Sequence, residues 1–490
     1  MTTGTAGRRP PMRTITCSAL VDRDGTRGPS RLTLDGGTIT AVEALPAGEP
    51  HDDLVVMPAL ANAHDHGRTI RTSSIGGFGR PLEVWLHRLR LFAPLDPYLA
   101  AAAPFSRAVA GGQGAAMVHY TGVQGLTPYV DEVREVARAA SDAGLRIAFA
   151  VAMRNQNPLV YGDSAPVLDH LSPEARAEVE KRFLSVAPLP VAAQLERVDA
   201  VAEAIGGPMV DVQYGPQGVQ WATPELLEAI AEASARTGRR VHMHLLETRY
   251  QRDYADAAFP QGIVTHLKEI GLLSPRLTLA HCVWARPGEI DLLAEAGVTV
   301  SVNTSSNLAL RSGLAPVAAL LKAGVKLAIG IDGQAFDEDD DLLREMRLIW
   351  SLHAGWGFER EMRVEDVLEA VLANGHATLN SPVTGRIAAG APADLVLVDR
   401  AALDADALMP VEPVELLFAR ATARHVKETI VAGRTVLSDG RVTGIDQEAV
   451  HHEVRSRLRS GMVAGEGFRA VLPELETTIC RHFGERLGCC

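Results

Sequence analysis

The chain has 490 residues, a hydrophobic fraction of 47% and a formal net charge of −12. This length suits one large domain with a smaller unit, and the acidic balance argues against a nucleic acid or an anionic membrane as partner. No apolar stretch reaches the roughly 18 residues of a membrane span, and the N-terminal segment lacks the apolar core of a signal peptide. We therefore expect a cytoplasmic protein that acts on a small molecule. Five scattered cysteines argue against a disulfide framework or a zinc ribbon.

Both ends of the chain carry short alternating segments separated by glycine turns. Examples are residues 31–39 near the N-terminus and residues 395–398 and 427–434 near the C-terminus. Alternation with a period of two is typical of strands with one buried face. We expect residues 1–56 and 384–440 to form one small β-sandwich from both chain ends.

The first strand expected beyond this unit, residues 54–66, ends in His64-Asp65-His66. Residues i and i+2 of a strand point to the same face, so His64 and His66 can bind one metal ion together. The alternative is that both are only polar residues at the end of a strand.

Seven more apolar, β-branched runs follow, separated by segments with helical periodicity such as 129–143, 175–184, 224–236, 289–296 and 315–323. Repetition of strand and helix implies parallel pairing, and eight such units close a TIM-type (β/α)8 barrel, expected over residues 57–383. The amphipathic residues 441–490 are expected to form a helical extension. The further strands are expected at 115–120, 146–152, 209–214, 240–246, 277–282, 298–303 and 326–332.

Polar residues stand at the ends of several of these strands. His242 and His244 close one strand, His281 closes the next, and Asp332 closes the last. Catalytic residues of a TIM-type barrel come from the C-terminal ends of different strands. The pattern therefore predicts a single site that these residues share with the first histidine pair.

The ordered set of motifs resembles the amidohydrolase superfamily, within it the branch of cytosine deaminase, adenosylhomocysteine-type deaminases and triazine hydrolases. The resemblance covers most of the chain and implies a metal-dependent enzyme that is usually a homo-oligomer. The motifs are Met57-Pro58 with His64-Asp65-His66, His244-Leu245-Leu246-Glu247, His281, Ser305-Ser306-Asn307-Leu308 with Ser312-Gly313, Gly330-Ile331-Asp332-Gly333, and Gly385-Arg386 through Asp394-Leu395-Val396.

The resemblance implies a role for each matching residue. A divalent ion lowers the pKa of bound water to about 7, and Asp332 can then take the proton of that water. His281 would hold the nucleophile, and Glu247 would protonate a ring nitrogen of the substrate. A solvated loop carboxylate is the alternative interpretation of Glu247. The metal ligands implied are His64, His66, His244 and Asp332.

The number of metal ions is expected to be one. Binuclear relatives carry a bridging lysine on the fourth strand, but residues 209–214 contain none, and Lys181 lies in a helical stretch. Zinc and ferrous iron both suit the implied ligands. His242 and His119 are interpreted as barrel-interior and structural histidines, with a direct role at the site as the alternative.

Three residues are candidates for binding the substrate. Related deaminases have Gly-Pro-His after the fourth strand, whereas this chain has Gly215-Pro216-Gln217, and the Gln217 amide can hydrogen-bond without supplying charge. Arg71 and Trp85 follow the first histidine pair. Aromatic residues such as Trp85 on this face suggest a flat, ring-shaped substrate, although core packing explains Trp85 equally well. The acidic run 337–341 is interpreted as solvated negative charge at the N-terminus of a helix. The alternative is a lid that binds a cationic group of the substrate.

These features predict a mononuclear metal-dependent hydrolase that deaminates an amino-substituted heterocycle or a cyclic amidine. The alternative at the same site is hydrolysis of an amide or of another C–N or C–halogen bond, or the reverse condensation that closes a ring. A non-catalytic metal-binding barrel would be expected to have lost at least one of the six site residues, and all six are present.

Overall fold

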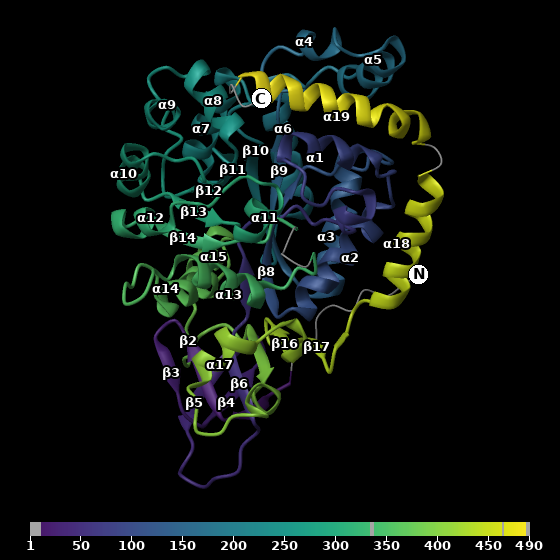
Figure 1. Cartoon of the computed structure of the whole chain (residues 1–490). Coiled ribbons are helices and arrows are strands. Elements are labelled where there is room, and N and C mark those ends of the chain that lie inside the picture. Colours follow the sequence, from purple (N-terminus) through teal and green to yellow (C-terminus); the bar gives the residue numbers. More distant parts are fainter. Residues whose placement is uncertain (1–10, 334–337, 463–464, 487–490) are drawn as a thin grey trace.

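The computed structural model describes residues 11–333, 338–462 and 465–486. In this part of the chain, eight parallel strands pair in sequence order to form one sheet that curls into a barrel (Figure 1). The short apolar runs of the sequence are these strands, and their side chains are almost all buried. The strands are β7 (Leu60–Asn62), β8 (Gln113–Tyr120), β9 (Arg146–Met153), β10 (Val210–Pro216), β11 (Val241–Leu245), β12 (Leu277–His281), β13 (Thr299–Val302) and β14 (Lys326–Ile329).

Backbone hydrogen bonds bring the first strand against the last. The Ala63 N–H donates to the Ile329 carbonyl at 2.8 Å, and the Asp332 N–H donates to the His64 carbonyl at 2.9 Å. Gly330 permits this approach, because a Cβ there would lie only 2.7 Å from the His64 backbone nitrogen. The expected TIM-type barrel is therefore confirmed, and its closure places the ends of β7 and β14 side by side.

Helices follow the barrel strands and cover the outside of the sheet (Figure 1). The predicted helix at 129–143 coincides with the observed α3, where buried Val133, Val136 and Ala140 recur at helical spacing. The helices up to the end of the barrel are α1 (Leu82–Arg88), α2 (Pro97–Ala110), α3 (Tyr129–Ala143), α4 (Ala165–Leu168), α5 (Pro173–Val179), α6 (Val191–Ile205), α7 (Pro224–Thr237), α8 (Arg249–Ala258), α9 (Ile263–Glu269), α10 (Pro287–Glu295), α11 (Thr304–Ala309), α12 (Val317–Ala323), α13 (Leu342–His353), α14 (Val364–Glu369) and α15 (Gly375–Thr378).

A small β unit contains strands from both ends of the chain, as expected. Its seven-stranded sheet has the order β18-β17-β16-β15-β6-β2-β3, and its three-stranded sheet has the order β1-β4-β5. An apolar core that includes Leu32, Ile39, Leu395 and Ile430 joins them. The strands are β1 (Arg13–Cys17), β2 (Ala19–Asp22), β3 (Gly25–Arg27), β4 (Ser30–Asp35), β5 (Thr38–Ala44), β6 (Leu54–Pro58), β15 (Leu395–Asp399), β16 (Val426–Val431), β17 (Arg434–Ser438) and β18 (Arg441–Val442).

The single strand expected at 54–66 is two strands in different sheets. β6 pairs with β15 of the small unit, whereas β7 pairs with β8 of the barrel. Pro58 has no N–H group and cannot continue the hydrogen-bond ladder of β6. The next two N–H groups change partner: that of Ala59 donates to the Asp394 carbonyl beside β15 of the small unit, and that of Leu60 donates to the Gly112 carbonyl beside β8 of the barrel. An apolar run alone does not show such a change of partner.

One buried ion pair joins the barrel to the small unit. Arg146, the first residue of β9, donates from Nε to Asp394 Oδ1 at 2.9 Å and from Nη2 to Oδ2 at 3.3 Å, and the Asp394 side chain is fully buried. Arg146→Met leaves that carboxylate without its cation, so we expect the free energy of unfolding to fall by about 3–5 kcal/mol.

Urea denaturation measures this loss. Arg134→Met is the matched control, because Arg134 and Asp131 form an ion pair on the surface whose side chains are both more than half exposed. Its removal is expected to change stability by less than about 1 kcal/mol. Equal effects of the two substitutions would contradict the role given to the buried pair.

The C-terminal residues form two helices, and the second lies across one end of the barrel (Figure 1). That helix packs against α1, α4 and α5 through an apolar core that includes Phe468, Leu475 and Phe483. No helix in the described ranges is long and apolar enough to cross a membrane. The remaining helices are α16 (Arg400–Asp404), α17 (Pro413–Arg420), α18 (Gln447–Gly461) and α19 (Glu466–Arg486).

Candidate active site

The polar residues singled out in the sequence gather at the C-terminal ends of the barrel strands. His64 and His66 follow β7, His244 lies in β11, His281 ends β12 and Asp332 follows β14. His281 has φ +77° and Asp332 has φ +54°, which are left-handed conformations that a non-glycine residue seldom adopts. Such strain is typical of functional sites, where the fold holds a side chain in a required direction.

The histidine and carboxylate donor atoms lie at distances that suit one metal ion. His66 Nε2 lies 3.1 Å from His244 Nε2 and 3.2 Å from Asp332 Oδ1, and His64 Nε2 lies 3.3 Å from the same oxygen. Tetrahedral zinc with bonds of about 2.0–2.1 Å separates neighbouring ligand atoms by about 3.3 Å. The spacing of this cluster therefore matches that of a tetrahedral metal centre.

The outer ring nitrogens of two of these histidines fix their tautomers. His66 Nδ1 lies 2.8 Å from the His119 carbonyl oxygen, and His244 Nδ1 lies 2.6 Å from that of Gln217. A carbonyl only accepts, so each Nδ1 carries the proton and each Nε2 presents a lone pair. Two lone pairs 3.1 Å apart repel each other unless a cation lies between them. The buried His64 Nε2 and Asp332 Oδ1, which lack hydrogen-bond partners, also fit a bound divalent ion.

Two further histidines stand behind this cluster, as their interpretation as interior residues requires. His242 is fully buried, with Nε2 2.7 Å from His64 Nδ1. His119 is also fully buried, with Nε2 3.0 Å from the Gly215 carbonyl oxygen. Burial lowers the pKa of both rings, which favours their neutral form. They therefore orient the inner histidines without adding charge.

Asp332 is held as a carboxylate despite its burial. Burial opposes ionisation, but the contacts of the carboxylate with His64 and His66 hold the pKa of Asp332 well below its usual range. Its second oxygen, Oδ2, accepts a hydrogen bond of 2.6 Å from the Ser306 hydroxyl. One oxygen thus faces the histidines while the other is fixed by serine.

Glu247 and His281 lie beside each other, as the sequence predicts. Glu247 is 3% exposed, and its Oε2 lies 3.8 Å from His281 Nε2. Burial raises the pKa of Glu247, which favours the protonated form. His281 Nδ1 lies 2.8 Å from the Asn307 amide oxygen and so donates to it, which leaves Nε2 free to face the site. The pair can supply a proton and a hydrogen-bonding ring at one point.

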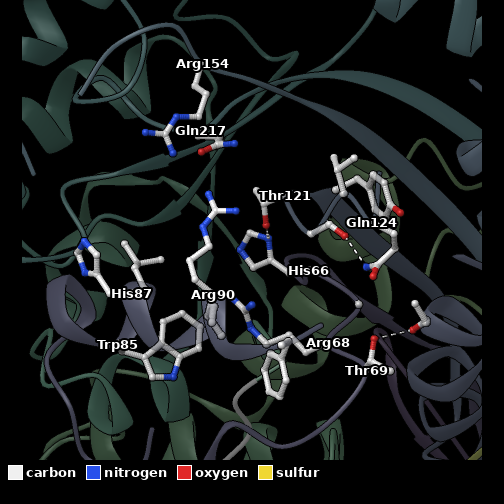
Figure 2. Close-up of a pocket in the computed structure, with 18 of the residues that line it drawn as sticks. His66, Arg68, Thr69, Trp85, His87, Arg90, Thr121, Gln124, Arg154 and Gln217 are labelled. Atoms are coloured by element: carbon white, nitrogen blue, oxygen red, sulfur yellow. Dashed lines mark hydrogen bonds between the residues drawn. The ribbon is translucent and has the colours of Figure 1, made fainter. Parts of the chain in front are cut away.

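A cavity of about 610 Å³ opens over these groups, with His66, His244, Glu247 and Asp332 among its lining residues. Gln217 and Trp85 also line it (Figure 2). The structure does not bring Arg71 to the cavity, because that side chain is exposed and donates from Nε to the Glu338 carbonyl at 3.0 Å. The volume is within the range of cavities that bind small molecules.

Arg68 and Glu83 are lining residues close to the donor cluster and to Glu247 that the sequence did not single out. Arg68 lies 4.4 Å over the Trp85 ring, and its charge acts on Asp332 and Glu247. Glu83 accepts a hydrogen bond of 2.6 Å from Thr248, burial raises its pKa to about 7, and its Oε2 has no partner. The position of Arg68 two residues after His66 was an available signal, whereas the burial of Glu83 depends on tertiary packing.

The acidic run 337–341 is described only from Glu338 onward, and Asp337 lies outside the described residues. Asp341 accepts hydrogen bonds from Leu343 and Arg344 at the start of α13, and Asp340 lies 2.7 Å from Arg107. These contacts agree with the interpretation as helix N-terminal charge.

Comparison with known proteins places this geometry in a family. The family model "Amidohydrolase family" matches residues 55–436. A 5-methylthioadenosine/S-adenosylhomocysteine deaminase of Desulfovibrio desulfuricans is 30% identical over 405 residues, which cover 82% of this chain and 84% of that protein. A 5'-deoxyadenosine deaminase of Methanosarcina barkeri is 33% identical over 247 residues. The matched part covers 50% of this chain and 56% of that protein.

A solved structure shares the fold. Atrazine chlorohydrolase from Arthrobacter aurescens TC1, crystallised with zinc, superposes with a TM-score of 0.74 at 21% identity and covers 91% of this chain and 99% of its own. The fold thus recurs in a solved structure, and a family model matches most of the chain. The chain belongs to the amidohydrolase family.

Proposed function

We propose that this protein hydrolytically deaminates an amino-substituted nitrogen heterocycle, with one divalent ion, zinc, held by its clustered donors. The observation that carries the proposal is the buried Glu247 carboxyl beside His281, in the same cavity as the donor cluster. An aromatic amidine carbon accepts a nucleophile readily only when the neighbouring ring nitrogen is protonated, and Glu247 is a proton donor at that place. The ligands of the ion would be His64, His66, His244 and Asp332.

The side chains divide the proton transfers between them. A bound divalent ion would acidify water and so supply the nucleophile. Asp332 accepts the proton of that water. Glu247 delivers a proton to the ring nitrogen, and the lone pair of His281 Nε2 accepts a hydrogen bond from the attacking water. Asp332 then passes its proton to the amino group, which leaves as ammonia when the C–N bond breaks, and the proton of the new C–OH group returns to Glu247.

The cavity supports a flat substrate. Trp85 and Trp221 line it, and Gln217 supplies an uncharged amide that can pair with a ring edge. The relatives are named for 5'-deoxyadenosine, 5-methylthioadenosine and S-adenosylhomocysteine. Adenine nucleosides are therefore the first substrates to test.

A second candidate activity is hydrolysis of a carbon–halogen or amide bond at the same site. Gln217 favours it, because the amide at this position offers no charge where the related deaminases carry histidine. A good leaving group needs less proton delivery than ammonia does.

The experiment that tests the proposal is a screen for ammonia release. Purified zinc-loaded protein is incubated with aminated purines, pterins, pyrimidines and adenine nucleosides, and with chlorinated counterparts of each. Ammonia release from at least one amino compound is the expected result. Release of chloride alone would replace the deaminase proposal with the second candidate.

We expect metal analysis to give close to one equivalent of zinc per chain, because the candidate donor groups share His64, His281 and Asp332 and so surround one place. Removal of the ion with a chelator should lower the melting temperature, since buried lone pairs would then face each other without a cation. Addition of zinc should restore both the melting temperature and turnover. A reproducible two equivalents at full activity would contradict the single-ion proposal.

A further inference from the structure

Three arginines line the same part of the active-site cavity: Arg90, Arg154 and Arg182. Arg90 lies in η2 (Leu89–Leu91), Arg154 directly follows β9, and Arg182 lies in η3 (Glu180–Leu184). Figure 2 shows the guanidinium groups of Arg90 and Arg154 on the same side of the cavity, near Gln217. Segments that are far apart in sequence thus bring three cations to one place.

Among the described residues, none of these three guanidinium groups has a carboxylate partner. Arg154 Nη2 donates to the Asn157 carbonyl at 3.0 Å, and Arg182 Nη1 donates to the Arg90 carbonyl at 3.2 Å. Arg88, two residues before Arg90, differs in this respect, because its Nε lies 2.5 Å from the Glu476 carboxylate. The cavity arginines therefore keep donors available for an acceptor that is not part of the protein.

The charges of these arginines act on one another. Burial lowers the pKa of Arg90, and the charge of Arg182 lowers it further. Burial also lowers the pKa of Arg154, to about 10, with the charge of Arg90 as the next cause. Arg154 is half-buried, whereas Arg90 and Arg182 are exposed at the part of the cavity that is open to solvent. Their like charges repel one another in the unliganded protein, and a bound anion would reduce that repulsion.

Aromatic rings lie against all three guanidinium groups, and that of Arg154 lies 5.8 Å from the Trp221 ring. The Arg182 guanidinium lies 4.9 Å over the Phe468 ring of α19, and that of Arg90 lies 5.7 Å from the Phe183 ring. Phe183 and Phe468 contact each other, with ring centroids 5.9 Å apart. The C-terminal helix therefore supports this end of the cavity.

We propose that Arg90, Arg154 and Arg182 form a subsite for an anionic group, a carboxylate or a phosphate, carried by the substrate whose ring reacts at the metal end. Planar guanidinium groups bind such oxyanions through two parallel hydrogen bonds. The arginines and the donor cluster line one continuous cavity, so a single molecule can reach both. The identity of the reacting ring rests on the proposed function, whereas anion binding does not.

The first test is binding of inorganic phosphate, and separately of acetate, to the zinc-loaded protein by calorimetry. Arg154→Met should weaken binding of the preferred anion about tenfold to a hundredfold, the effect of losing a hydrogen bond between charged groups. The matched control is Arg434→Met, because Arg434 is an exposed arginine of the small β unit that no carboxylate pairs with in the described residues. Equal affinity in the parent and Arg154→Met would show that the anion binds only at the metal and would overturn the subsite.

The second test uses adenosine, adenosine 5'-monophosphate and adenosine 5'-carboxylic acid, which share one ring and differ in charge. The ratio of kcat/KM for the anionic over the neutral compound should exceed one in the parent and fall about tenfold or more in Arg154→Met, mainly through KM. The anionic compound with the larger increase in kcat/KM over adenosine shows whether the subsite prefers phosphate or carboxylate. A ratio unchanged by the substitution would overturn the proposal.

The two tests separate failure of the subsite from failure of the deaminase function. If no adenosine compound releases ammonia but phosphate binding still depends on Arg154, the subsite stands without the proposed substrate ring. If adenosine is deaminated while phosphate binding is the same in both proteins, the subsite is wrong and the function stands. Melting temperatures of the variants show whether each is folded.

Discussion

Asp332→Asn is expected to lower kcat by at least about three orders of magnitude while the protein remains folded. The asparagine amide keeps the size of the side chain and can still accept the 2.6 Å hydrogen bond from Ser306, but it cannot take a proton from water. Steady-state ammonia release measures the loss. Metal analysis of the variant shows how much of it follows from weaker metal binding.

Asp211→Asn is the control for this substitution. Asp211 lies in β10 and accepts hydrogen bonds from Gln213 and Asn380, and it does not line the cavity. The control should retain turnover within about twofold of the parent, the effect of a distant surface change. If Asp332→Asn itself retained turnover within about tenfold, another group would be the base.

Much of the fold was predictable because the barrel strands are short, apolar and separated by helical periodicity. Parallel strands are buried on both faces, so their sequences show as continuous runs such as 146–152, which is β9 in the structure. The division of 54–66 into β6 and β7 was not predictable, because both strands are apolar and only their partners differ. The pattern of apolar residues indicates that a strand is buried, but it does not indicate which neighbouring strand it pairs with.

The donor cluster was predictable for a related reason. His64, His66, His244 and Asp332 each stand at the end of an apolar run, and a parallel barrel brings such ends together. Arg71 shows the limit of this argument. It lies only five residues beyond His66, but its side chain turns to the Glu338 carbonyl instead of the cavity. Proximity in sequence to a ligand does not determine the direction of a loop side chain.

The cavity arginines could not be found in the sequence, since Arg90, Arg154 and Arg182 lie in three separate segments with no common spacing. Their lack of carboxylate partners is a property of packing, and the sequence contains more acidic than basic residues overall. Net charge excluded a polyanionic partner, but it carried no information on a local group of cations inside one cavity.

Glu247→Gln separates the two candidate activities, because it removes a proton donor while keeping the size of the side chain. If the reaction is deamination, kcat should fall by roughly two to four orders of magnitude, the usual contribution of a general acid. KM should change little, since the glutamine amide can still contact Gln251, which lies 3.4 Å from the carboxylate. Ammonia release by parent and variant on the compound found in the screen is the measurement.

The matched substrate is the analogue in which chloride replaces the reacting amino group. Chloride leaves without a proton, so its release should be lowered by Glu247→Gln far less than ammonia release, and the ratio of the two rates should change by at least about tenfold. Glu228→Gln, at an exposed position of α7, controls for the loss of one carboxylate from the protein. If Glu247→Gln keeps the full rate of ammonia release, Glu247 is not the acid. If both leaving groups are slowed equally, Glu247 acts on the nucleophile and not on the ring nitrogen, because only a proton delivered to the ring distinguishes ammonia from chloride.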